Sequence, residues 1–277
     1  MRKILQQRSA FFVSDRTGIT AETMGLSLIS QFDLIEFVRT TLPFIDSITK
    51  AERAKERINA AYAADKTLPI VFGTLIAPPI RKIITSAQGH FIDFFGTFIA
   101  PLETVLACKS SHSIGKIHAQ GNLTTYNQRM EAVNFALNVD DGAQTQKYQQ
   151  ADLILIGVSR SGKTPTCLYL AMQYGIKAAN YPLTEEDMQS SDLPKLLAPY
   201  TKKLFGLTIN PQRLHTIRAS RFPHSQYAEL RQCQREVRIV EALFAKSSVP
   251  YLSATALSIE ELSSKLLDIT QIQRHFP

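Results

Sequence analysis

The chain has 277 residues, of which 44% are hydrophobic and 20% charged, the composition of a soluble globular protein with one large or two smaller domains. No apolar run is long enough to span a bilayer and the first residues lack a signal-peptide core, so we expect a cytoplasmic protein without a membrane partner. The net charge is +7, but the basic residues are scattered, which argues against a nucleic-acid partner. Three widely spaced cysteines argue against a disulfide framework or a zinc site.

The first part of the chain, residues 1–106, alternates predicted strands with predicted helices, which indicates an amino-terminal α/β domain with a parallel sheet. The predicted strands are 10–15, 37–44 and 68–75. The residues expected to be buried are Met24, Leu28, Ile29 and Phe32 in the first helix, and Ala51, Ala54, Ile58 and Tyr62 in the second. Residues 80–106 are predicted to be helical throughout.

Residues 107–150 are predicted to connect this domain to the next, as a polar loop over 107–123 and a helix over 124–138. We interpret the loop histidines, His112 and His118, as solvated. The residues expected to be buried in the helix are Tyr126, Met130, Val133 and Leu137. The segment then reaches Asp140-Asp141-Gly142. Adjacent carboxylates on a glycine turn can hold Mg²⁺ or accept a proton, but these residues also favour an ordinary solvated turn, so both interpretations stay open.

A phosphate-binding loop is predicted between Ala151 and Tyr174, where a buried strand is followed by a glycine loop and a helix. The loop residues are Gly157, Val158, Ser159, Arg160, Ser161, Gly162, Lys163 and Thr164. They match the pattern G-x-x-x-x-G-K-[ST], in which backbone N–H groups surround a phosphate. Lys163 supplies positive charge for the outer phosphates and the Thr164 hydroxyl is placed for Mg²⁺. The helix that follows directs its positive dipole end at the same point.

From Ala151 onward the order of elements is that of a small P-loop kinase, which predicts a nucleotide-binding α/β domain over 151–277. Further strands are expected at 176–183, 204–210 and 249–254, and helices from Pro211, over 227–245 and from Ile259. The helix that begins at Pro211 carries Arg213, Arg218 and Arg221. These arginines suit a lid that neutralises a transferring phosphoryl group, and the alternative is that they are solvated charges.

One part of a typical P-loop kinase is missing from this half of the chain. The strand 204–210 ends in Asn210, where a Walker B aspartate would help to hold the metal ion. The metal is then held by Thr164 and the phosphates, or by an aspartate from elsewhere in the chain. The candidates are Asp140, Asp141 and Asp15, which follows the first strand at the edge where open α/β sheets bind ligands.

Four stretches of the sequence together resemble one known family. They are GVSRSGKTPTCLYLAMQYGIKAANYPL, LFGLTINPQRLHTIR, SQYAELRQCQREV and the amino-terminal SDRTGITAE. They are similar to the pyruvate, phosphate/water dikinase regulatory proteins, which include the bacterial phosphoenolpyruvate synthase regulatory proteins, and the resemblance extends over nearly the whole chain. One departure is Val139, where we expect the family to carry histidine more often, and this argues against a histidine role at the adjacent turn.

The resemblance implies a bifunctional serine/threonine protein kinase and phosphorylase. Such an enzyme inactivates phosphoenolpyruvate synthase by phosphorylating a threonine with ADP as donor. It reactivates the target by removing that phosphate with inorganic phosphate, releasing pyrophosphate. On this reading the loop Gly157–Thr164 is the ADP site, Mg²⁺ is the expected cofactor, and Lys163, Asp140, Asp141 and Asp15 are the catalytic candidates. The residues alone do not choose ADP over ATP and do not name the target.

Three alternatives stay open at this point. The same chemistry can act on pyruvate, phosphate dikinase. A small-molecule P-loop kinase would need only the second half of the chain and a metabolite-sized acceptor pocket. Outside the enzymes, a nucleotide-gated nucleic-acid-binding protein would show salt-dependent retention on DNA or RNA. The sequence also leaves the assembly open between a monomer and a homodimer.

Overall fold

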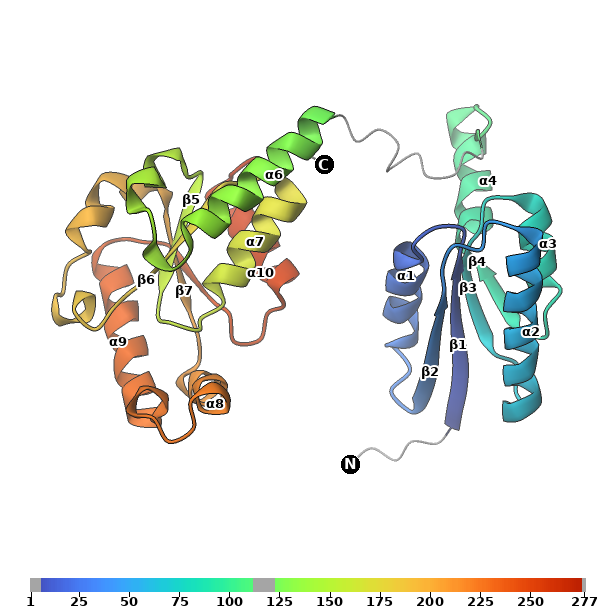
Figure 1. Ribbon diagram of the computed structural model, residues 1–277, viewed down its shortest axis with the longest axis horizontal. Helices are drawn as coiled ribbons and strands as arrows, with labels where there is room; N and C mark the ends of the chain where they lie inside the picture. Colours follow the sequence, from blue (N-terminus) through green and yellow to red (C-terminus); the bar gives the residue numbers. More distant parts are fainter. Residues whose placement is uncertain (1–5, 112–122, 276–277) are drawn as a thin grey trace. The chain divides into compact units, whose positions relative to one another are not determined.

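The computed structural model describes residues 6–111 and 123–275, and it divides into two compact units, Met1–Gln120 (unit 1) and Gly121–Pro277 (unit 2). Each unit contains a four-stranded parallel sheet, which confirms the predicted α/β class (Figure 1). The strand order is β2-β1-β3-β4 in unit 1 and β6-β5-β7-β8 in unit 2. The first strand of each unit therefore lies between the second and the third. Most of the predicted loop over 107–123, with His112 and His118, lies outside the described residues.

Unit 1 alternates strands and helices from its first strand to its last helix. Its strands are β1 (Gln6–Ser14), β2 (Ile35–Leu42), β3 (Ile70–Thr74) and β4 (His90–Asp93). Its helices are α1 (Ile19–Ile29), α2 (Ile48–Asp65), α3 (Pro78–Thr85) and α4 (Phe94–Leu106). The strand β4 lies inside the stretch 80–106, which the sequence predicted as helix throughout. That prediction was wrong because a strand of four residues between two helices is too short to show a period of its own.

Successive residues of β1 point to opposite faces of the sheet, and each face packs against its own helices. Phe11 and Val13 lie in a core cluster with α2 and α3, whereas Ala10 and Phe12 lie in a cluster with α1 and the start of α4. The predicted buried face of α2 is confirmed at Ala51, Ala54 and Ile58, all of which are buried.

The predicted buried face of α1 was largely wrong. Met24, Leu28 and Phe32 are exposed, and the buried positions of the helix are Ala21, Gly25 and Ile29. A Cβ at Gly25 would lie 2.5 Å from the Phe12 ring, so the helix approaches the sheet through its small residues. A pattern of large apolar residues does not reveal a contact of this kind.

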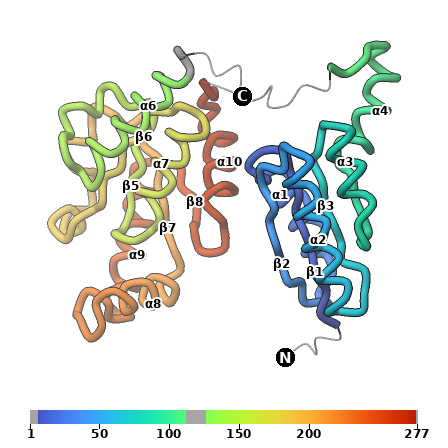
Figure 2. The backbone as a smooth tube through the Cα atoms, turned by 45° about the vertical axis from the view of Figure 1, so that its right-hand side comes forward, coloured from blue at the N-terminus to red at the C-terminus, as the bar shows by residue number. Residues whose placement is uncertain are grey.

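Unit 2 begins with a helix and continues into the second sheet. Its strands are β5 (Leu153–Gly157), β6 (Ala178–Pro182), β7 (Leu204–Thr208) and β8 (Tyr251–Ser253). Its α-helices are α6 (Leu123–Asn138), α7 (Lys163–Tyr174), α8 (Pro211–Arg221), α9 (Leu230–Lys246) and α10 (Ile259–Thr270). Short 3₁₀ segments are η1 (Asp140–Gly142), η2 (Thr145–Gln150), η3 (Asp187–Gln189), η4 (Lys195–Lys203) and η5 (Gln226–Ala228). The helices α8 and α9 lie side by side (Figure 2).

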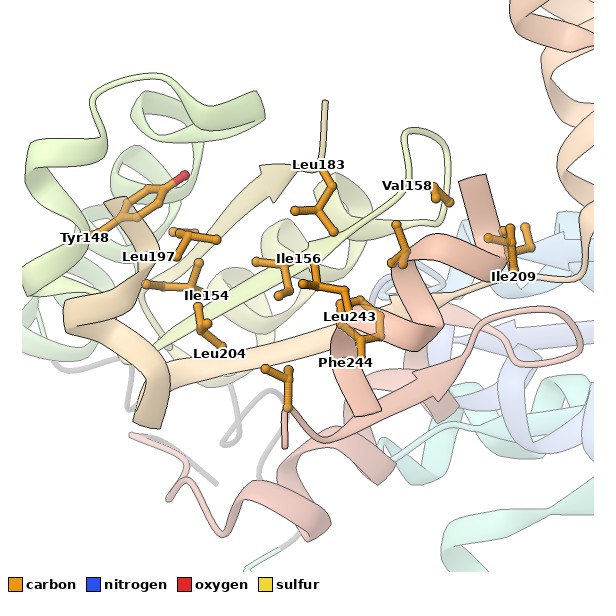
Figure 3. Close-up of a cluster of buried hydrophobic side chains, with 14 of the residues drawn as sticks. Tyr148, Ile154, Ile156, Val158, Leu183, Leu197, Leu204, Ile209, Leu243 and Phe244 are labelled. Atoms are coloured by element: carbon orange, nitrogen blue, oxygen red, sulfur yellow. The ribbon is translucent and has the colours of Figure 1, made fainter. Parts of the chain in front are cut away.

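The sheet of unit 2 is covered on both faces, and its two central strands, β5 and β7, are buried along their whole length and almost wholly apolar. Ile154 and Ile156 of β5 pack with Leu243 and Phe244 of α9 (Figure 3). The alternate residues of β5 pack on the other face with α6, α7 and α10. None of the helices within the described ranges is long and apolar enough to cross a membrane.

The helix α6, which the sequence assigned to a connecting segment, packs against α7. Its predicted buried residues were wrong at Tyr126, Met130 and Leu137, which are exposed. The buried positions include Ala132 and Ala136, which share a core cluster with the α7 residues Leu170 and Ala171. As in α1, small residues make a close contact, although the larger side chain of Phe135 is also buried, in the core cluster on the other face of the sheet.

Candidate active site

The loop from Gly157 to Thr164 joins the internal strand β5 to α7, so it lies at the carboxyl end of the parallel strands. This is the position at which open parallel sheets bind ligands, because neighbouring connections leave the sheet in opposite directions. Gly157 has φ 152°, and a Cβ on it would lie 2.2 Å from the Leu207 carbonyl oxygen. Only glycine allows the loop to start so close to β7.

Two further residues in the loop have left-handed backbone conformations. Gly162 has φ 92° with open space around its α-carbon, so the backbone conformation alone favours glycine there. Arg160 has φ 72°, a conformation that costs a non-glycine residue about 1 kcal/mol or more. The turns reverse the chain within a few residues and bring it into α7, whose amino-terminal N–H groups and dipole favour an anion.

The side chain of Lys163 is buried against its own loop. Its exposed fraction is 4%, and its Nζ donates hydrogen bonds to the carbonyl oxygens of Gly157, at 3.1 Å, and Val158, at 2.9 Å. Burial lowers the pKa of Lys163 to about 8, and the carboxylates of Asp141 and Asp140 act in the opposite direction. The lysine therefore remains mainly protonated at pH 7 and holds its charge on the loop carbonyls.

Thr164, Asp140 and Asn180 form one hydrogen-bonded cluster beside the loop. The Thr164 hydroxyl donates to Asp140 Oδ1 at 2.9 Å. Asn180 Nδ2 donates to the same carboxylate oxygen and, at 3.0 Å, to Thr164 Oγ1. Asn180 comes from β6, and its backbone carbonyl accepts a hydrogen bond from the Tyr148 hydroxyl at 3.0 Å. The structure therefore brings one of the two predicted turn aspartates onto the residue predicted to bind the metal.

The two aspartates of the turn differ in their surroundings. Asp140 is partly buried and bonded to Thr164 and Asn180, whereas Asp141 is exposed and has a left-handed backbone with φ 49°. The Asp141 side chain makes no hydrogen bond within the described residues, but its charge acts on Lys163. Asp140 is thus a fixed part of the site, and Asp141 is a carboxylate that stays accessible beside it.

Asp15 belongs to unit 1 and is buried there, with an exposed fraction of 5%. Its carboxylate accepts a hydrogen bond from the Ile76 N–H at 3.1 Å, and burial raises its pKa above the ordinary value. The neighbouring hydroxyls of Ser14 and Thr74 bond to each other at 3.0 Å. The described partner of the Asp15 carboxylate is therefore the Ile76 backbone in its own unit, just after β3.

The three arginines of α8 divide into two kinds. Arg213 and Arg221 are exposed, as solvated or phosphate-binding residues would be. Arg218 is 1% exposed and pairs with Glu236 of α9, so it is neither a solvated charge nor free to move onto a substrate. The sequence pattern did not separate the three, because burial depends on the packing of α8 against α9.

The donor set at the loop fits a magnesium ion bound together with phosphates. Mg²⁺ prefers oxygen ligands and is commonly held by one or two carboxylates and the phosphate oxygens of its substrate. Asp140 and Thr164 supply a carboxylate and a hydroxyl, and Asn180 Oδ1 is buried without a hydrogen-bond partner in the described part of the chain. Across residues 6–111 and 123–275, no group of three or more His, Cys, Asp or Glu side chains is arranged to hold a metal ion by itself.

Asn180 is a site residue that the sequence analysis missed. A signal for it was present, because Asn180 lies inside the predicted strand 176–183, which follows the loop helix. In a parallel sheet this strand runs beside the strand that leads into the loop, so a polar residue near its carboxyl end lies near the site. A buried polar atom without a hydrogen-bond partner needs a physical explanation, and a role as a ligand in the site is one explanation for the Asn180 oxygen.

The chain is similar to known proteins over nearly its whole length. A family model described as kinase/pyrophosphorylase matches residues 10–267. Relatives from Marinobacter nauticus and Hahella chejuensis are 52% and 51% identical over 269 residues, which is 97% of this chain and 99% of each relative. A relative from Pseudomonas aeruginosa is 53% identical over 270 residues, 98% of each chain, and all three are provisionally named phosphoenolpyruvate synthase regulatory protein. The chain belongs to the kinase/pyrophosphorylase family of phosphoenolpyruvate synthase regulatory proteins.

Proposed function

We propose that this protein regulates phosphoenolpyruvate synthase by reversible phosphorylation of a threonine. In the inactivating direction ADP donates its β-phosphoryl group and AMP leaves. In the activating direction inorganic phosphate removes the phosphoryl group and pyrophosphate leaves. The observation that carries the proposal is the cluster of Thr164, Asp140 and Asn180 beside the glycine loop, in a chain whose relatives bear this regulatory name.

The loop supports the binding step of this reaction. Its backbone N–H groups and the start of α7 would surround the β-phosphate. Lys163 would leave the carbonyl oxygens of Gly157 and Val158 and bond to the outer phosphate oxygens, where its charge stabilises the transferring group. Asp140 and Thr164 would hold Mg²⁺, which neutralises charge on the phosphates when it is bound.

Asp141 is the best placed general base for the kinase direction. Asp140 is occupied by Thr164 and Asn180, whereas Asp141 is exposed on the same turn and accessible to a threonine of an incoming protein. The threonine oxygen would attack the β-phosphorus, the bond from this phosphorus to the bridging oxygen would break, and Asp141 would accept the hydroxyl proton. In the reverse direction an oxygen of hydrogen phosphate would attack the phosphothreonine phosphorus and the bond from this phosphorus to the threonine oxygen would break. The threonine oxygen would take up the proton that the attacking phosphate loses, and pyrophosphate would leave.

The proposal is tested with the full chain, phosphoenolpyruvate synthase and ADP labelled in the β-phosphate. Label is expected on a threonine of the synthase, and later addition of inorganic phosphate is expected to release it as pyrophosphate. The Lys163→Ala variant should leave the synthase unlabelled. Labelling of pyruvate, phosphate dikinase but not of the synthase would favour the alternative target, and transfer to neither protein would contradict the proposed function.

A further inference from the structure

Three consecutive carbonyl oxygens of the glycine loop point at buried cations. Lys163 Nζ binds those of Gly157 and Val158, and Arg218 Nη2 binds that of Ser159 at 3.2 Å. In a planar trans peptide the N–H points away from the carbonyl oxygen. The N–H groups of Val158, Ser159 and Arg160 are therefore turned away from these cations, an arrangement that favours an anion on their side of the loop.

Arg218 is fixed independently of the loop. Its guanidinium binds both carboxylate oxygens of Glu236, at 2.6 and 3.1 Å, and donates to the Tyr227 carbonyl oxygen at 3.0 Å. Its Cζ also lies 3.9 Å from the centre of the Tyr227 ring. Glu236 is buried and receives a further hydrogen bond from Gln232 at 3.0 Å. A forked ion pair of this kind has a defined geometry, so Arg218 stays in place when the loop changes its other contacts.

Tyr227 holds the same loop residue through its hydroxyl. The Tyr227 hydroxyl donates to Ser159 Oγ at 2.9 Å, so both the carbonyl and the side chain of Ser159 are bound by residues of the α8–α9 region. The next residue, Arg160, has the left-handed conformation that is costly for a non-glycine residue. Such a conformation persists where surrounding contacts determine it, and the two bonds to Ser159 supply these contacts.

We propose that Arg218, Tyr227 and Glu236 (the Arg218 cluster) are positioning residues that hold the Ser159–Arg160 peptide in the orientation that binds the phosphoryl donor. The inference rests on the proposed function, because it assigns a role within the same loop. Lys163 exchanges its loop carbonyls for phosphate oxygens when the donor binds, whereas Arg218 keeps the Ser159 carbonyl. Loss of the cluster therefore weakens the binding of ADP, and it also weakens the binding of inorganic phosphate in the reverse reaction.

The most selective variant is Tyr227→Phe, which removes one hydroxyl and keeps the ring beside Arg218. Loss of one hydrogen bond is worth about three- to tenfold in ADP affinity. Ser159→Ala removes the other partner of that bond, so the double variant should bind ADP no more weakly than the weaker single variant. Tyr200→Phe is the matched control, because Tyr200 is a half-buried tyrosine of unit 2 whose hydroxyl has no hydrogen bond within the described residues. It should bind ADP as the wild type does.

A second variant separates positioning from fold stability. Replacing the buried pair with Arg218→Met and Glu236→Met together leaves no unpaired charge, and such replacements are often neutral for stability. If the cluster positions the loop, this double variant keeps the wild-type melting temperature within a few degrees but binds ADP at least about tenfold more weakly. If the pair only supports the packing of α8 on α9, ADP affinity follows stability alone.

The experiment is calorimetric titration of the full-length variants with ADP and Mg²⁺, with melting curves recorded on the same samples. Wild-type ADP affinity in Tyr227→Phe would overturn the proposed role, as would an additive double variant with Ser159→Ala. If Arg218→Met/Glu236→Met does not fold, the Tyr227→Phe and Ser159→Ala cycle still decides the question. Failure of the wild type to bind ADP would instead contradict the proposed function, so the two failures are distinguishable.

Discussion

The buried lysine of the loop gives a prediction about stability as well as activity. Lys163 is 4% exposed, and burial lowers its pKa from 10.5 to about 8. The site therefore carries a positive charge at pH 7, and the burial of this charge lowers the free energy of unfolding. Replacing Lys163 with Met keeps the length of the side chain and removes the ionisable group, so it should abolish phosphoryl transfer and alter the pH dependence of unfolding in a defined way.

The sign follows from proton binding. Between pH 8 and 10.5 the unfolded chain holds a proton on Lys163 that the folded chain has lost, so the free energy of unfolding rises with pH in this window. The Lys163→Met variant lacks this contribution. From pH 7 to pH 10 the wild type should gain about 2.5 kcal/mol of stability relative to the variant. The hydrogen bonds from Lys163 to Gly157 and Val158 affect the size of the difference in unfolding free energy between the two proteins. They contribute less to the change of this difference with pH.

The assay is urea denaturation of both proteins at several pH values from 7 to 10, followed by far-ultraviolet circular dichroism because the chain has no tryptophan. Unit 1 is identical in both proteins, so the difference between the two curves reports on unit 2. A difference in unfolding free energy that stays constant over this range would show that Lys163 titrates in the folded protein as it does in the unfolded one. That result would refute the burial of its charge in the loop.

The same geometry predicts the effects of changes at the aspartate turn, at Asn180 and at Gly157, and the effect of ADP on the reverse reaction. Asp140→Asn should weaken Mg²⁺-dependent ADP binding, whereas Asp141→Asn should lower the kinase rate at least about tenfold with little change in ADP affinity. Steady-state kinetics of both single variants and the double variant test these effects. Normal turnover in all three variants would contradict any role of the turn. Asn180→Leu should impair transfer more than it impairs thermal stability, measured side by side, because the replacement keeps the buried volume and removes the bonds to Asp140 and Thr164. Gly157→Ala should cost about 3 kcal/mol in denaturant unfolding, because its Cβ would meet the Leu207 carbonyl oxygen, and a variant of wild-type stability would show that this approach is not maintained. ADP should inhibit release of pyrophosphate from the phosphorylated target, whereas phosphorolysis indifferent to saturating ADP would indicate two separate sites.

The α/β class and most of the strand and helix positions were predictable because they depend on local patterns. The buried strands and the phosphate loop carry period and composition within a few residues. The inner faces of α1 and α6 were not predictable in this way. Gly25 in α1 and Ala132 and Ala136 in α6 face the core because a sheet strand or a second helix approaches closely, and that approach depends on tertiary packing.

The candidate site was predictable to the extent that its residues are adjacent in the sequence. The pattern from Gly157 to Thr164 contains most of it, and the carboxylate pair was marked by its glycine turn. The pattern did not show that Asp140, but not Asp141, bonds to Thr164, since this depends on how η1 meets β6. Nor did it show that Arg218 is buried and bonded to Ser159, which comes from 59 residues earlier in the chain.

The central claim is that the loop Gly157–Thr164 holds the phosphoryl donor, and the most direct measurement is calorimetric titration of wild type, Lys163→Met and Asp15→Asn with ADP and Mg²⁺. We predict one ADP bound per wild-type chain, binding at least about tenfold weaker in Lys163→Met, and unchanged affinity in Asp15→Asn, whose substitution lies in unit 1. Unchanged affinity in Lys163→Met, with binding lost in Asp15→Asn, would contradict the claim and place the nucleotide site in unit 1.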